Sequence, residues 1–556
     1  MDLRLCVVLA ILETLLITAI DCNVGISVGE CKATVTFWTL FLAQILAIKF
    51  YRIFLYHRYF SPLRHLPTPK GNHFFFGQAL NLIKADSPTT LHVQWMKQFP
   101  GAPLIRFLTF GNNEVLLVNS LNAHKDMFQT KCYSFRKPDR WSRMMKDITG
   151  IGLATLEGEE HRAHRKMLSS TFSPGSIRRL QPVFQAKARE VCELFDRAIA
   201  ISGYENVGAI DCTDTFSKAT LDIMSLTTLG VGLSHMASIG SAETLQARGE
   251  LAKSPYTFHE AYSTIFGPDT IGKLLMFGNM FLPTRWLPLE ANHRFKFATT
   301  WLHDTLSRLV HQRFRDVKVT SSEGKYSAKG SQDILSFIVE ESMPGGVASG
   351  ITKDLVKGHL LQFLGAGHDT SANSISWCMH TLATRQDCQA KLRDEICQLT
   401  NRVPSPGFSD LDNLPYLNQF VKEVLRVYPP ASIIYRQANE GIIIDGVEVP
   451  KDTCFEVVAA VTSMNPYIWG ENAEMFDPSR WDCLTEVQAS PYAFAAFSNG
   501  PRICIGRQFA LYEIKTILVE IIRSFEVLDD MEPFTIENPG LTLRPHGMKV
   551  RFRRTD

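Results

Sequence analysis

The sequence lacks several features that mark common classes of protein. Its 58 lysines and arginines nearly balance 56 aspartates and glutamates, so the net charge of +2 favours neither a nucleic acid nor an acidic substrate as partner. The 12 cysteines follow no common spacing and include no Cys-x-x-Cys pair, which argues against a disulfide framework. There is also no Asn-x-Ser/Thr acceptor for N-glycosylation. These absences favour a protein that faces the cytosol and keeps its cysteines reduced.

Two long apolar runs stand at the N-terminus. The run from Leu5 to Ile20 is interrupted only by Glu13, and the run over residues 33–48 carries no charge. A membrane-spanning helix needs about 20 apolar residues, so each run is borderline by itself. Lysines and arginines follow the second run, and the positive-inside tendency places that side in the cytosol. We expect residues 1–60 to form a membrane anchor of one or two transmembrane helices; for the first run, a cleaved signal peptide is the alternative.

The rest of the chain is predicted to be one body. Residues 61–71, with three prolines and a glycine, predict a stiff, non-helical hinge. Residues 72–556 show mostly helical periodicity without a repeat, interrupted by two predicted hairpins at 103–119 and 442–450. The polar segment 320–333 predicts a surface loop. The expected fold is mainly α, one large helical domain with small β-sheets.

One cysteine has an unusual setting. In "FSNGPRICIG", Cys504 precedes an apolar-faced helical pattern, and a helix N-terminus favours an anion such as a thiolate. Arg502 adds positive charge, while Gly500 and Gly506 let the backbone approach something flat or bulky. A structural cysteine, a catalytic nucleophile and a heme-iron ligand all fit these residues. Zinc is disfavoured because no further ligands stand nearby.

The same loop resembles the cysteine-ligand loop of the cytochrome P450 family. The matching positions are Phe497, Gly500, Arg502, Cys504 and Gly506. Further matches extend from about residue 61 to the C-terminus. The resemblance implies the cytochrome P450 fold, with residues 72–556 as a heme-thiolate catalytic domain. It also implies heme b (iron-protoporphyrin IX) as cofactor and Cys504 as its axial iron ligand.

A second match lies inside a long predicted helix, in "FLGAGHDTSA". Helix-interior glycines cost about 1 kcal/mol each relative to alanine, so they indicate either a helix–helix contact or close approach to a cofactor or substrate. An acid and an alcohol, Asp369 and Thr370, follow the glycines, and the alcohol could loosen the helix backbone there. The segment resembles the central helix of cytochromes P450. That resemblance implies that Ala366 and Gly367 face bound dioxygen and that Asp369 and Thr370 relay protons.

Two further sets of residues carry the resemblance. Glu423 and Arg426, an ordinary surface pair if taken alone, match with Arg480 the buried triad behind the cysteine loop. "EGEEHRAHRKMLSSTFS" reads by itself as a solvated helix face or as a weak metal pair of two histidines. The resemblance instead implies a helix that grips a heme propionate, in which Arg165 matches the arginine and His161 replaces the usual tryptophan.

Two other arginines complete the implied propionate cluster. Arg436 and Arg502 match its remaining positions. Two carboxylates buried against protein need such charge-assisted partners. The four residues implied to hold the propionates are therefore His161, Arg165, Arg436 and Arg502.

The resemblance implies monooxygenation, the insertion of one oxygen atom from O2 by hydroxylation or epoxidation. The segments expected to line the substrate pocket are largely apolar, which favours a lipophilic small-molecule substrate. These candidate walls are 133–156 (read as a loop), 255–288, Phe363, Ala366, 431–434 and 541–543. The overall pattern is similar to that of microsomal fungal enzymes of terpenoid, polyketide or alkaloid pathways in secondary metabolism. Fatty-acid hydroxylation, a peroxygenase and an isomerase are the alternatives.

The expected partners follow from the same resemblance. No flavin- or nicotinamide-binding domain follows Cys504, so electrons are expected from NADPH-cytochrome P450 reductase, with cytochrome b5 as a further candidate donor. The expected location is the endoplasmic reticulum membrane, with the catalytic domain facing the cytosol. No nucleic-acid partner is expected.

Overall fold

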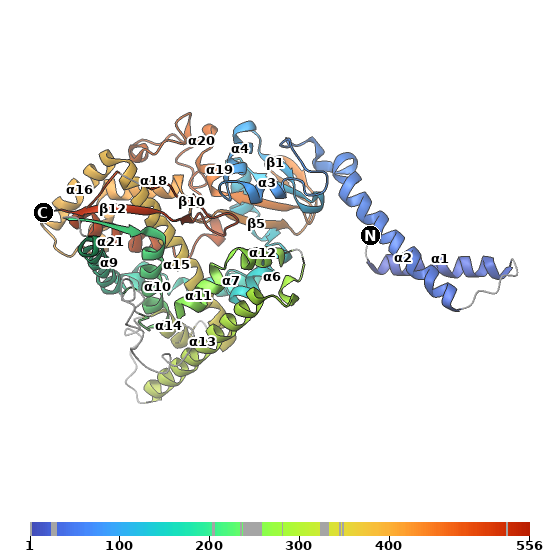
Figure 1. The fold of residues 1–556 in the computed structure, drawn as a ribbon, viewed down its shortest axis with the longest axis horizontal. Coiled ribbons are helices and arrows are strands. Elements are labelled where there is room, and N and C mark those ends of the chain that lie inside the picture. The colour runs from blue at the N-terminus through green and yellow to red at the C-terminus, as the bar shows by residue number, and fades with distance from the viewer. Residues whose placement is uncertain are drawn as a thin grey trace.

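The computed structural model consists of a large helical body and two helices that project from one side of it (Figure 1). It describes residues 3–23, 30–202, 206–233, 236, 258–280, 282–322, 333–343, 346, 350–529 and 532–555. The mainly α fold with small sheets is confirmed.

The described α-helices are numbered in chain order. They are α1 Leu3–Asn23, α2 Glu30–Phe50, α3 Ala79–Lys84, α4 Thr90–Gln98, α5 Leu121–Lys125, α6 Asp139–Thr149, α7 Gly158–Ser169, α8 Pro174–Arg178, α9 Gln181–Ser202, α10 Cys212–Leu229, α11 Phe258–Phe266, α12 Thr270–Gly278, α13 Glu290–Ser322, α14 Ile334–Glu341, α15 Lys353–Thr384, α16 Gln386–Thr400, α17 Phe408–Asp412, α18 Pro415–Val427, α19 Ala459–Ser463, α20 Pro466–Trp469 and α21 Arg507–Ser524. Short 3₁₀- and π-helical turns lie between them, among them η1 Tyr51–Phe60, η2 Pro62–His65, η4 Asp126–Thr130 and η10 Gly500–Arg502.

The strands form four small sheets. The largest has the order β1-β2-β8-β5-β3, a second has the order β4-β12-β9, and two are the pairs β10-β11 and β6-β7. Their bounds are β1 Leu104–Leu108, β2 Glu114–Val118, β3 Phe135–Arg136, β4 Val207–Asp211, β5 Ile433–Ala438, β6 Ile442–Ile444, β7 Val447–Val449, β8 Cys454–Val458, β9 Phe525–Val527, β10 Thr535–Ile536, β11 Pro545–His546 and β12 Lys549–Arg554.

Both predicted hairpins are confirmed. In the first, β1 and β2 pair antiparallel from Leu104 opposite Val118 to Leu108 opposite Glu114. In the second, the turn between β6 and β7 has φ of 44° at Asp445 and 78° at Gly446. Positive φ at both central residues matches the right-handed strand twist, which explains the Asp-Gly pair.

Helix α15 runs through the core of the body (Figure 1). It begins where the Thr352 hydroxyl accepts a hydrogen bond from the Leu355 N–H, and most of its side chains are buried. It packs against α10, α13, α18 and α21. The long helix predicted around "FLGAGHDTSA" is therefore confirmed, and it carries that segment at its middle.

The predicted hinge is not free of helix, and it is docked on the body. Pro62–His65 forms a 3₁₀ turn because the Ser61 hydroxyl accepts the Leu63 N–H at 3.1 Å, so the non-helical expectation is wrong there. Ser61 also donates to the Glu114 carboxylate at 2.8 Å. Leu63 and Leu66 are buried against the largest sheet. This segment fixes the end of the anchor to the body.

Two other expectations need correction. The segment 133–156 contains a helix, α6, so the prediction of a loop is wrong over residues 139–149. Gly150 ends this helix. The predicted surface loop 320–333 begins inside α13, which continues to Ser322, and residues 323–332 lie outside the described residues.

Candidate active site

The loop before α21 is fixed by close backbone contacts. The Cys504 N–H donates to the Phe497 carbonyl at 2.8 Å. Gly500 adopts a φ of 65°, and a Cβ at this position would lie 1.8 Å from the carbonyl oxygen of Phe128 in η4. A side chain at Gly500 would therefore push the loop away from the body, which explains the glycine.

Cys504 lies just before the start of α21, as the sequence predicts. The residue is exposed, although surrounding protein raises the pKa of its thiol by burial. The Gly506 N–H and the cations Arg165 and Arg507 act in the opposite direction and lower that pKa. Protein surrounds this thiol closely, and these three groups would stabilise its thiolate.

Helix α15 also exposes a short stretch at its middle. Ala366 is exposed in the middle of this mostly buried helix, and the Thr370 hydroxyl donates to its carbonyl at 2.6 Å. The glycines on either side face other helices. A Cβ at Gly365 would lie 2.8 Å from the Phe266 ring, and one at Gly367 would lie 2.5 Å from the Met224 sulfur. These glycines therefore serve helix contacts, and Ala366 faces open space.

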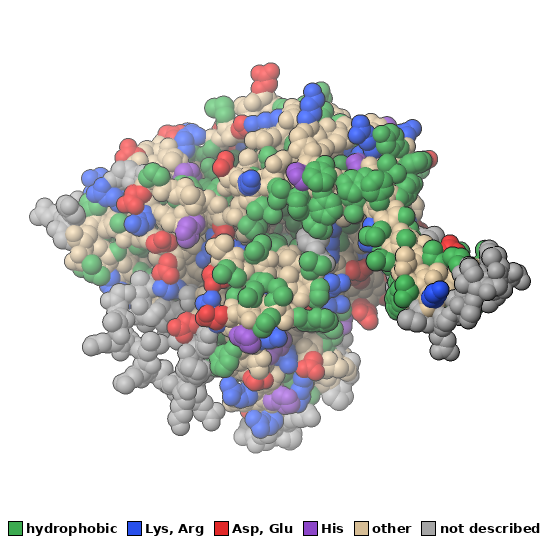
Figure 2. All heavy atoms as spheres, turned by 45° about the vertical axis from the view of Figure 1, so that its right-hand side comes forward, with side chains coloured by type: hydrophobic (Ala, Val, Ile, Leu, Met, Phe, Trp, Pro, Cys, Tyr) green, Lys and Arg blue, Asp and Glu red, His purple; other side chains and the backbone are tan. Residues whose placement is uncertain are grey.

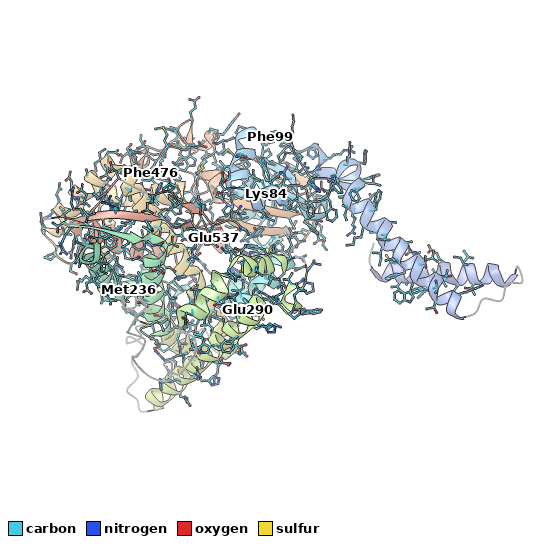
Figure 3. The ribbon with its side chains drawn as sticks, in the orientation of Figure 1. Lys84, Phe99, Met236, Glu290, Phe476 and Glu537 are labelled. Carbon is cyan, nitrogen blue, oxygen red and sulfur yellow. The ribbon has the colours of Figure 1, made fainter. Side chains whose placement is uncertain are left out.

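Asp369 is held by the C-terminal segment. One of its carboxylate oxygens accepts the Thr542 hydroxyl at 2.5 Å, and Thr542 accepts an N–H of Asn373 at 3.1 Å. The Arg544 guanidinium lies 3.9 Å from the other oxygen. The same guanidinium lies 3.9 Å from the carboxylate of Glu537, which is labelled near the middle of Figure 3 and which pairs with Lys273 of α12. The acid of the acid–alcohol pair thus has fixed partners more than 170 positions away in the chain.

A cationic cluster lies near the cysteine loop. Arg502 and Lys137 bind the Glu157 carboxylate, at 2.6 Å and 2.9 Å. Burial, with a smaller contribution from Arg502, lowers the pKa of Arg436 to about 10. Burial also lowers the pKa of Arg165, while Cys504 raises it, so Arg165 lies beside the thiol. The structure thus brings together the residues that the sequence assigns to one cluster.

His161 belongs to the same cluster. Burial, Arg502 and Lys137 lower its pKa to about 3, so its imidazole is neutral at physiological pH. Its Nδ1 and the Nε of Arg502 are buried and have no hydrogen-bond partner among the described residues. Such a cluster, with buried polar atoms that lack partners and several cations around one carboxylate, suits the binding of a further anionic group. The two propionates of heme have this charge.

The contacts of three residues of the site were missed from the sequence. Lys137 and Glu157 join the cationic cluster, and Thr542 holds Asp369. Thr542 lies in the proposed wall 541–543, and Glu157 begins the segment that contains His161 and Arg165. No local pattern predicts the pairing of these three residues.

The predicted triad is buried and fully paired. Glu423 accepts from Arg426 at 2.7 and 2.8 Å and from Arg480 at 3.3 Å. Trp481 and the backbone N–H of Asp477 donate to the same carboxylate. Because all of these groups are paired inside the protein, loss of one would strand a buried charge, which costs several kcal/mol.

Comparison with known proteins assigns the family. A model of the family described as Cytochrome P450 matches residues 67–552. Cytochrome P450 monooxygenase sphH of Aspergillus fumigatus (strain CBS 144.89 / FGSC A1163 / CEA10) is 28% identical over 536 residues, 93% of each chain. Cytochrome P450 monooxygenase FUM15 of Gibberella moniliformis (strain M3125 / FGSC 7600) is 28% identical over 555 residues, 89% of each chain. Cytochrome P450 monooxygenase ALT8 of Alternaria alternata is 26% identical over 570 residues, 90% of this chain and 91% of its own.

The chain belongs to the cytochrome P450 family and is a cytochrome P450 monooxygenase. The family implies a heme-thiolate iron cofactor, a redox partner and a lipophilic substrate.

Proposed function

We propose that this enzyme inserts one oxygen atom from O2 into a lipophilic small molecule, by hydroxylation or epoxidation, in the biosynthesis of a terpenoid, polyketide or alkaloid secondary metabolite. The observation that carries the proposal is the accessible Cys504 thiol at the start of α21, the helix that packs against α15. On α15, Ala366 is exposed and is followed by Asp369 and Thr370. We infer that the two helices border one hollow.

Heme b is the proposed cofactor, with Cys504 as its thiolate ligand. When bound, a thiolate-ligated heme activates dioxygen once electrons and protons are supplied. Arg165, Arg436 and Arg502 would bind the propionates as charge-assisted donors. His161 would donate a single N–H, because its low pKa keeps it neutral. Phe497, Gly500 and Gly506 would shape the loop that holds the ligand.

Protons would arrive through Asp369 and Thr370. The Thr370 hydroxyl already donates to the Ala366 carbonyl, which leaves its oxygen lone pairs free to accept a further hydrogen bond. Asp369 is turned toward Thr542, so it must rotate away before it can pass a proton to Thr370. Thr542 and Arg544 would thereby hold the acid until the rotation occurs. Gly367 lies between the exposed alanine and this pair, and its contact with Met224 fixes the helix there.

The substrate class rests on the apolar lining. Ala431 bridges to Thr542, which brings two of the proposed wall segments together. Phe363 stacks edge-on against Phe172 at a centroid distance of 5.1 Å. A largely apolar lining favours a lipophilic substrate and excludes water from the reacting atoms. A fatty acid is the alternative substrate.

The proposed location is the endoplasmic reticulum membrane, with residues 1–60 as anchor, 61–71 as the connecting segment and 72–556 as a catalytic domain in the cytosol. The helical stretch Lys32–Phe60 is long and apolar enough to cross a membrane. Figure 2 shows hydrophobic side chains gathered on the body next to the anchor. Phe74 of the body is exposed, and its ring stacks on that of Phe54 in η1 at a centroid distance of 6.4 Å. This location suits electron transfer from NADPH-cytochrome P450 reductase or cytochrome b5.

The proposal is tested by measuring NADPH and oxygen consumption by the purified holoenzyme with added reductase, over a panel of lipophilic compounds that shift the heme absorbance on binding. We expect product formation that depends on reductase and consumes oxygen. Product formed with hydrogen peroxide but not with reductase would instead identify a peroxygenase. A product formed without oxygen consumption would identify an isomerase.

A further inference from the structure

The two N-terminal helices lie against each other in the structure (Figure 1). On α1, the side chains of Cys6, Ala10 and Thr14 recur every four residues and are 2, 0 and 9% exposed. Their spacing places them on one face of the helix. The Thr14 hydroxyl donates to the Ala10 carbonyl at 2.6 Å, so its proton already has an acceptor within the helix. Small side chains of this kind allow two helices in a membrane to approach closely.

A polar contact joins the same two helices. The Glu13 carboxylate accepts a hydrogen bond from the Gln44 amide at 2.7 Å. A polar group in hydrocarbon is expensive unless it has a partner, and membrane helices satisfy such groups across their contact. Glu13 counts against a membrane span when α1 is considered alone. Paired with Gln44, it becomes a specific link between α1 and α2.

Most of the remaining residues between Leu5 and Ala19 of α1 are apolar. Its large side chains are 45–62% exposed at Leu5, Val8, Ile11, Leu12, Leu15 and Leu16. Each of the two helices has 21 residues, which at about 1.5 Å per residue matches a hydrocarbon core about 30 Å thick. Helix α2 likewise exposes large apolar side chains, among them Trp38, Leu42 and Leu46. Lipid is therefore the occupant that this surface fits.

We propose that α1 and α2 cross the membrane as a hairpin, joined by the Glu13–Gln44 hydrogen bond, and that the N-terminus lies on the cytosolic side with the catalytic domain. The inference rests on the proposed membrane anchor and goes beyond it, because a single span by α2 would place the N-terminus in the lumen. The basic residues fix the orientation of α2, because Lys49, Arg52 and Arg58 follow its apolar run, whereas Arg4 at the start of α1 and Lys32 at the start of α2 balance each other. In Figure 1 the N-terminal end of α1 lies nearer the body than the C-terminal end of α1 does.

The test places a cassette with an Asn-x-Ser acceptor and an epitope at one of two sites in the full chain. One cassette precedes Met1, and the other is inserted between Gly25 and Ile26. Both chains are expressed in cells that glycosylate in the lumen, and a C-terminal epitope reports the orientation of the body. The hairpin predicts that only the inner cassette is glycosylated. It also predicts that protease removes the N-terminal and C-terminal epitopes from sealed microsomes.

Other results overturn the hairpin and are distinguishable from failure of the anchor. Glycosylation of both cassettes would show that α2 is the single span, and glycosylation of neither would show that the helices do not cross. Loss of the N-terminal epitope from the mature protein would show cleavage of a signal peptide. Membrane anchoring is measured separately, by carbonate extraction of the membranes. A protein that carbonate releases from the membrane would contradict the anchor itself.

The polar link is tested by substitution in the chain with the inner cassette. Gln44→Leu leaves the carboxyl of Glu13 without its partner and should lower the glycosylated fraction about twofold or more. Combining it with Glu13→Leu should restore the fraction, because both polar groups are then gone. Thr39→Leu, at an exposed position of α2, is the matched control. An unchanged fraction in Gln44→Leu would show that the hydrogen bond does not stabilise the hairpin.

Discussion

The Thr370 hydroxyl has two possible roles, and the geometry separates them. Its hydrogen bond to the Ala366 carbonyl resembles the bond from Ser374 to the Thr370 carbonyl one turn later, at 2.8 Å. Such bonds are local to a helix, and each is worth about 1 kcal/mol. Thr370 differs in its position, since it lies next to Asp369 and one turn from the exposed Ala366, whereas Ser374 is buried.

We expect Thr370→Ala to separate NADPH consumption from product formation. If the hydroxyl positions a proton, its loss should lower the ratio of product to NADPH several-fold, with peroxide released instead. Heme content and substrate affinity should change little, because Thr370 is not an iron ligand. The ratio is measured with peroxide assayed in parallel. Ser374→Ala removes an equivalent helix bond and should leave the ratio unchanged; an unchanged ratio in Thr370→Ala would contradict the proton-relay role.

The conformation of the cysteine loop depends on the close contact between Gly500 and η4. Gly500→Ala would drive a methyl group into the Phe128 carbonyl and would strain a φ of 65°. We expect this variant to bind at most a small fraction of the heme bound by the wild type, measured as heme per polypeptide. Gly441→Ala, at a position with no atom near its Cβ, is the control. Full heme content in Gly500→Ala would show that the loop does not need this contact.

The contact between α15 and α21 carries a buried acid that should make stability depend on pH. Burial raises the pKa of Glu513 from 4.5 to about 8, and the Ser371 hydroxyl on α15 offsets this only in part. Between pH 4.5 and 8 the unfolded chain has lost this proton while the folded chain keeps it. The free energy of unfolding therefore falls as pH rises through this window, by an amount on the order of 5 kcal/mol.

We expect Glu513→Gln to remove this part of the pH dependence and to raise the apparent Tm at pH 7.5, about half a unit below the folded pKa. The apparent Tm of the holoenzyme is compared between pH 5.5 and pH 8, a range chosen to lie mostly within the window. Glu532→Gln, at an exposed position, should behave like the wild type. A variant Glu513→Gln with the wild-type pH slope would show that the buried carboxyl does not cause it.

Much of the fold and of the candidate site could be predicted from the sequence. The kind of signal that allowed the prediction differs between elements. Helix α15 and both hairpins follow from local periodicity and turn residues, which act within a few positions of the chain. The loop at Cys504 has a specific local pattern. The pairing of Asp369 with Thr542 joins positions 173 apart and has no periodic signal. The glycines of α15 have two explanations in the sequence, and only the neighbours Met224 and Phe266 decide between them.

For the whole molecule, the structure predicts where the anchor can be removed. A chain that starts at Ser61 keeps the hydrogen bond to Glu114 and the burial of Leu63 and Leu66. We expect it to bind heme and to leave the membrane fraction. A chain that starts at Gly71 loses both leucines from the core, at a cost of roughly 1.5–3 kcal/mol each, and should have a lower apparent Tm. Equal apparent Tm values would show that residues 61–70 are not part of the folded body.

The activity of the whole enzyme depends on Cys504 as the iron ligand, and the spectrum of the reduced protein with carbon monoxide checks this assignment. The wild type is expected to show the red-shifted Soret band of a thiolate-ligated heme. Cys504→Ser should lose this band, because an alcohol does not replace the thiolate, whereas Cys483→Ser, at an exposed cysteine away from the loop, should keep it. A Cys504→Ser protein that retained the red-shifted band would contradict the assignment of the ligand and the site built on it.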